Sequence, residues 1–99
     1  MYLIHLHLAP HPVGLPLPED TAAVVTDAVR PGSGVVRHVT VHPADGHGLV
    51  VGLYVAADGP EQAEAAARVT WWRAVAARPR LGGWPLLSTE LAMTLDRTP

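Results

Sequence analysis

Cysteine, lysine, asparagine and phenylalanine are all absent from this sequence of 99 residues. Without cysteine the chain can form no disulfide framework, no thiolate metal site and no cysteine nucleophile. Without lysine it can form no Schiff base with a carbonyl substrate, and every basic side chain is an arginine. Six histidines are present, and histidine is the side chain that titrates nearest to neutral pH.

Charged residues are also scarce, at 16% of the chain, and the formal net charge is −2. A weakly acidic chain is not drawn to nucleic acid or to anionic lipid, so we expect neither partner. Residues 1–18 carry no charged side chain, but three histidines and four prolines interrupt them. They lack the cationic start of a signal peptide and the run of about 20 apolar residues in a spanning helix. We therefore expect no membrane segment and a cytoplasmic location.

The length and the hydrophobic content of 48% are typical of one globular domain. We assign residues 1–93 to this domain and residues 94–99 to a flexible C-terminal tail. A domain of this size is only marginally able to bury its apolar surface, so a bare sheet face would be costly. The sequence therefore favours association of two copies.

Hydrophobic periodicity divides the domain into six elements, and prolines and glycines mark the turns between them. Tyr2–Leu8 alternates between two faces and predicts a half-buried strand. The other expected strands cover residues 35–42, 49–56 and 84–93, and the expected helices cover residues 18–30 and 59–78. A glycine-rich stop at 31–34 follows the first helix, and an Asp45–Gly46 turn joins the second and third strands.

The second helix contains two adjacent tryptophans. An apolar stripe at helical spacing predicts that its buried residues are Ala65, Val69, Trp72 and Ala76. Adjacent residues of a helix point about 100° apart, so we expect Trp71 at the margin of this stripe.

The order strand–helix–strand–strand–helix–strand resembles the ferredoxin-like fold. This resemblance implies an α+β domain, βαββαβ, with a four-stranded antiparallel sheet and both helices on one face. RNA-recognition domains of this fold need aromatic and basic side chains on the third strand, which here offers only Tyr54. Soft-metal chaperones need paired cysteines, and acylphosphatase-like enzymes need an asparagine.

Dimeric α/β-barrel proteins also share this element order and length, and the chain resembles them. They pair two such sheets face to face around a pocket, and they include cofactor-free monooxygenases, small isomerases and non-catalytic binders. The resemblance implies a homodimer without a cofactor. It implies no particular reaction, because many unrelated functions occur on this fold.

The sheet face away from the helices gathers the candidate binding residues. Alternation along the strands places on it His5, His7, His38, His42, Gly52, Tyr54 and Glu90. We expect Gly52 to leave open space for a ligand, and Glu90 to reach His5 or His7. On the fourth strand this interpretation puts Leu86, Ser88, Glu90 and Ala92 on the free face, and Leu87, Leu91 and Met93 in the core.

Three functions stay open at this point. The first is a non-catalytic binding module that dimerises through the free face and takes a small-molecule or protein partner. The alternative is a cofactor-free enzyme or ligand binder, in which His5 or His38 acts as a general base in a pocket. The third is a metal site made of His5, His7 and Glu90. Alternation alone accounts for histidines two residues apart, so we expect the first function and no bound metal.

Overall fold

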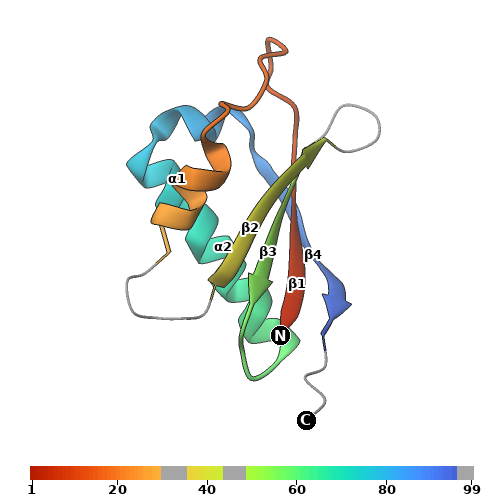
Figure 1. Cartoon of the computed structure of the whole chain (residues 1–99). Helices are drawn as coiled ribbons and strands as arrows, with labels where there is room; N and C mark the ends of the chain where they lie inside the picture. The colour runs from red at the N-terminus through yellow and green to blue at the C-terminus, as the bar shows by residue number, and fades with distance from the viewer. Residues whose placement is uncertain (30–35, 44–48, 96–99) are drawn as a thin grey trace.

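The structure, a computed structural model, describes residues 1–29, 36–43 and 49–95. Its elements in chain order are β1 (Tyr2–Leu8), α1 (Thr21–Asp27), β2 (Val36–Pro43), β3 (Leu49–Val55), α2 (Pro60–Ala77), the 3-10 helix η1 (Pro79–Gly83) and β4 (Leu86–Thr94). The strands form one antiparallel sheet in the order β2-β3-β1-β4 (Figure 1). The expected α+β class, with a four-stranded antiparallel sheet and two α-helices, is confirmed. The short helix η1 was not expected.

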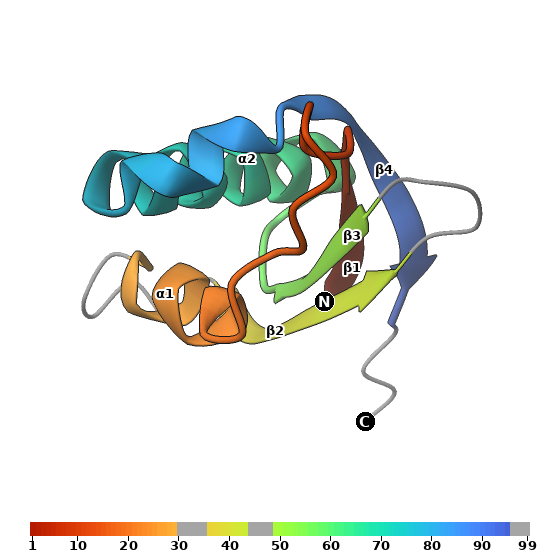
Figure 2. The same ribbon diagram turned by 90° about the horizontal axis from the view of Figure 1, so that it is seen from above.

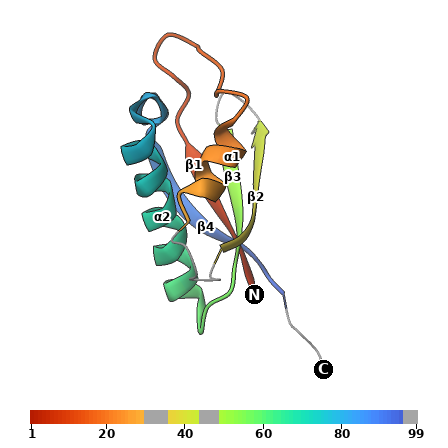
Figure 3. The same cartoon turned by 60° about the vertical axis from the view of Figure 1, so that its left-hand side comes forward.

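Both α-helices lie against the same face of the sheet (Figures 2 and 3). The core between them is built on the two central strands, where Ile4, Leu6 and Leu8 of β1 are almost fully buried. Alternate residues of β3 join them, and these are Val51, Leu53 and Val55. The alternation expected for the first strand is therefore confirmed, and the odd-numbered residues of β1 point away from the helices.

Helix α1 is shorter than expected, because it runs from Thr21 to Asp27 rather than over residues 18–30. The carbonyl oxygen of Pro18 accepts hydrogen bonds from the backbone N–H of Thr21 at 3.1 Å and from its hydroxyl at 2.6 Å. This closed turn precedes the helix, so Glu19 and Asp20 lie outside it. The expected glycine-rich stop and the Asp45–Gly46 turn fall outside the described residues.

Helix α2 has nearly the expected bounds but turns a different face to the sheet. Trp71 is 2% exposed, whereas Trp72 is 56% exposed. Ala65, Val69 and Ala76 are exposed too, so the whole predicted stripe is wrong. The buried residues of the helix are Ala63, Ala67, Thr70, Trp71 and Ala74. The threonine is tolerated there because its hydroxyl donates to the carbonyl oxygen of Ala66 at 2.8 Å.

Strand β4 pairs with β1 through two register shifts. Leu87 and Met93, which were expected in the core, are 67% and 51% exposed. Leu91 lies opposite the core residue Ile4, as expected, although its side chain is exposed. Leu86, expected on the free face, pairs with Leu8 and packs against the core. A bulge inserts one residue and so moves the following side chains to the other face. The assignments of Leu86, Leu87 and Met93 therefore failed on β4.

The two ends of the described chain meet at this edge. The backbone N–H of Leu95 donates to the carbonyl oxygen of Met1 at 2.7 Å, one residue beyond β4. Strand pairing thus continues past residue 93, where the expected domain ended, and residues 96–99 lie outside the described part. Among the described residues, no helix has both the length and the apolar composition that crossing a membrane requires.

Candidate functional site

The sheet face away from the helices is called the open face below. Residues directly opposite each other in an antiparallel pair share a face, so the register defines its members. They are Leu3, His5 and His7 of β1, His38, Thr40 and His42 of β2, Val50, Gly52 and Tyr54 of β3, and Ser88, Glu90 and Met93 of β4. The structure thus places every residue of the candidate site on this one face.

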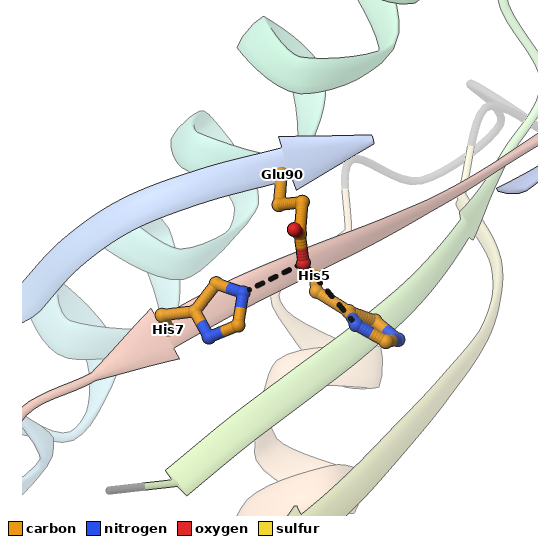
Figure 4. A group of neighbouring side chains, drawn as sticks. All are labelled: His5, His7 and Glu90. Carbon is orange, nitrogen blue, oxygen red and sulfur yellow. Dashed lines mark hydrogen bonds and ion pairs between the residues drawn. The ribbon is translucent and has the colours of Figure 1, made fainter. Parts of the chain in front are cut away.

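Three of these side chains converge at the junction of β1 and β4. Glu90 lies opposite His5 in the register, and both imidazole rings approach its carboxylate (Figure 4). The Nε2 atom of His7 is 3.0 Å from Oε1 of Glu90, and Nδ1 of His5 is 3.9 Å from the same oxygen. The two rings stand edge to face, with their centroids 6.2 Å apart. We call these three residues the histidine–carboxylate cluster.

The surroundings of His5 alter its acidity. Burial lowers the pKa of His5, because partial loss of water disfavours the charged imidazolium. The negative charge of Glu90 opposes this effect, whereas nearby His7 and His42 reinforce it. At neutral pH His5 is therefore held in its neutral form, in which one ring nitrogen keeps a lone pair for a proton or a cation.

The remaining histidines of the open face form contacts of their own on β2. The ring of His38 lies 5.9 Å from that of Tyr54, centroid to centroid. The Nε2 atom of His42 is 3.0 Å from the hydroxyl oxygen of Thr40. Val50 lies opposite both His7 and His42 in the two registers and is buried, although it is outside the main core. The histidines of β2 therefore contact Tyr54 and Thr40 rather than the carboxylate of Glu90.

The space above Gly52 is filled, so the expectation of a vacancy there is wrong. A Cβ atom at this position would lie 2.7 Å from the Thr40 hydroxyl oxygen and 3.5 Å from Cδ2 of His5. It would also lie 3.6 Å from Cδ1 of Leu3. Glycine is needed here to let neighbouring side chains close over the strand, and not to admit a ligand.

Replacing Gly52 by alanine should therefore destabilise the fold by about 1–3 kcal/mol, as overpacking of a tight site does. The clash is with one oxygen, so the double variant with Thr40→Ala should recover most of this loss. Thr40→Ser keeps the oxygen and serves as the matched control that should not rescue. Urea unfolding of the wild type, the three single variants and the two double variants measures the coupling. Equal stability of Gly52→Ala and the wild type would contradict the proposed contact.

A hollow outside the open face escaped the sequence reasoning. It has a volume of about 250 Å³ and is lined by Pro10, His11, Gly14, Leu15, Pro16, Leu49 and Trp84. The ring of His11 packs edge to face on buried Trp84, with the centroids 4.9 Å apart. His11 also lies where a Cβ atom on Gly83 would sit. The ring of His11 fits here because Gly83 has no side chain. The pair Gly82–Gly83 in the sequence does not by itself predict which residue fills the space.

Among the described residues, the histidine–carboxylate cluster thus brings together three residues chosen from the sequence across two strands, with His7 and Glu90 at hydrogen-bond distance. Its neutral imidazole and its carboxylate can accept protons or bind a cation. The chain matches no known protein-family model and no curated protein, so its function is inferred from the open face itself.

Proposed function

We propose that the chain is a small binding module that forms a homodimer by packing the open faces of two copies together. The observation that carries this proposal is that helices cover one face of the sheet, while the other bears Leu3, Val50, Tyr54 and Met93 among its histidines. The element order and the strand order β2-β3-β1-β4 support a ferredoxin-like arrangement of the dimeric α/β-barrel kind.

The size of the open face determines how a stable dimer would use it. Four strands spaced about 4.8 Å apart, each about seven residues long at about 3.3 Å per residue, give a projected area of about 440 Å². A stable interface buries about 800 Å² per partner. Side chains that project from the sheet increase this area. Even so, an interface of about 800 Å² per partner requires the whole open face. Ser88, Glu90 and Met93 of β4 are therefore part of the proposed interface.

The polar groups of the open face are compatible with burial at such an interface. His7 is paired with Glu90, and His42 is paired with Thr40, within a single chain. A polar group that already has a partner loses less on removal from water than an unpaired one. His7 and His42 therefore do not oppose dimer formation as unpaired polar groups would.

Sedimentation equilibrium of the wild-type chain tests the proposal. We expect a mass of about twice 10.5 kDa at micromolar concentrations, falling toward the single-chain mass on dilution. A mass of 10.5 kDa throughout the micromolar range would refute dimer formation.

A second candidate is a ligand-binding or cofactor-free catalytic pocket between the two sheets. The neutral state of His5 favours it, because a neutral imidazole beside a carboxylate is a competent general base. The single chain has no vacancy above Gly52, so the pairing of two copies would have to create the cavity. A structure of the dimer decides between the two functions, since a pocket for a small molecule requires an enclosed volume of about 300 Å³ or more.

A further inference from the structure

We propose that His5, His7 and Glu90 form a binding site for one divalent transition-metal ion, with Zn²⁺ as the representative ligand. Each residue contributes one donor atom, and the three donors all lie within 4.8 Å of one another. All three belong to one chain, so the site does not depend on the proposed dimer.

The donor spacing agrees with metal coordination. Four-coordinate zinc is tetrahedral and binds imidazole nitrogen and carboxylate oxygen at about 2.0–2.2 Å, so two donors of one ion lie about 3.4 Å apart. The Glu90 oxygen is within about 0.5 Å of this spacing from both His7, at 3.0 Å, and His5, at 3.9 Å. No two of the three donors are more than 4.8 Å apart, so binding requires a side-chain adjustment of at most about 1.4 Å.

The backbone holds the donors in place without a metal. His5 and His7 are two residues apart on β1, so strand geometry points both to the open face. The register with β4 places Glu90 opposite His5 and Ser88 opposite His7, between the two register shifts of this strand pair. The donors therefore lie on adjacent, hydrogen-bonded strands rather than on loops, which favours a preorganised site.

The donor chemistry selects a class of metal. Two imidazoles and one carboxylate suit zinc, iron, nickel or copper, whereas magnesium and calcium prefer oxygen ligands alone. Three protein donors leave at least one coordination position for water or an added ligand.

The contribution of the cluster to folding stability does not explain why these three side chains converge. Glu90 is 58% exposed, and an ion pair with such an exposed carboxylate contributes little to folding. The convergence of two histidines on one carboxylate oxygen is more simply explained by a cation that all three bind.

Isothermal titration of the metal-free, untagged protein with zinc chloride tests this inference. We expect one ion per chain, and at least a tenfold loss of affinity in His7→Ala and in Glu90→Gln, because even groups that only orient metal ligands are worth about tenfold or more. His38→Ala is the matched control: it removes a histidine of the same face outside the cluster and should bind zinc as the wild type does. His7→Gln replaces His7→Ala if the alanine variant does not fold.

No zinc binding by the wild type would overturn the inference, as would unchanged affinity in both cluster variants. The mass of each sample, measured with and without zinc, separates this result from the proposed function. A monomer that binds one ion would refute the dimer and keep the metal site, whereas a dimer that binds none would do the reverse.

Discussion

Replacing Trp71 by alanine should lower the free energy of unfolding by about 3–5 kcal/mol, whereas the same change at Trp72 should cost less than about 1 kcal/mol. Trp71 is 2% exposed and belongs to the core cluster between α2 and the sheet, so its removal leaves a large cavity. Trp72 is 56% exposed on the outer side of the same helix. The pair is a matched control in itself, because the residue type, the helix and the substitution are the same.

Chemical denaturation of the two variants measures the difference. A loss of this size is comparable with the whole stability of a small domain, so Trp71→Ala is at risk of not folding. Trp71→Phe keeps part of the ring and should give an intermediate loss that can be measured. Equal losses at the two positions, or a larger loss at Trp72, would show that the orientation of α2 is different.

The same two tryptophans show where sequence reasoning fails on this chain. Helix α2 is rich in alanine on most of its circumference, so several stripes at helical spacing are nearly equally apolar. The stripe through Trp72 contains no polar residue, while the buried stripe contains Thr70, which is satisfied inside the helix. Periodicity identified the helix, but the packing of a large ring against the sheet selected its face.

The open face illustrates a different limit. Strict alternation correctly assigned both sides of β1 and β3, because these central strands are regular over their described length. On β4, the two register shifts move Leu86, Leu87 and Met93 away from their predicted faces. No local sequence pattern predicts such a bulge. Glu90 kept its predicted face because it lies between the two shifts.

The vacancy predicted at Gly52 failed for a third reason. A glycine on a strand predicts close approach of some neighbour, but it does not identify the neighbour. Here the neighbour is Thr40 of the adjacent strand rather than a ligand. Cross-strand contacts of this kind depend on the register, which the pattern of a single strand does not contain.

Leu3→Arg should weaken self-association at least about 100-fold, equivalent to about 2.7 kcal/mol. Leu3 lies on the open face, opposite Tyr54 on β3 and Met93 on β4. In a face-to-face dimer the substitution occurs once in each copy and brings two guanidinium groups into an apolar contact, where removal from water is costly. In the separated chain Leu3 is partly exposed, so an arginine can extend its charge into water and leave the fold intact.

Trp72→Arg is the matched control for this substitution. It introduces the same charge in place of a larger apolar side chain, on the helix surface away from the open face. Dimers that pair through sheet edges or through α2 would respond differently, because Leu3 is on a central strand and an edge contact does not cover it.

Sedimentation equilibrium of the wild type, Leu3→Arg and Trp72→Arg at matched concentrations most directly tests whether the open face is the surface on which this protein binds its second copy. We expect the wild type and Trp72→Arg to sediment as dimers and Leu3→Arg to sediment near 10.5 kDa. If Leu3→Arg stays dimeric while Trp72→Arg dissociates, the helix surface is the interface, and the account given for the open face is wrong.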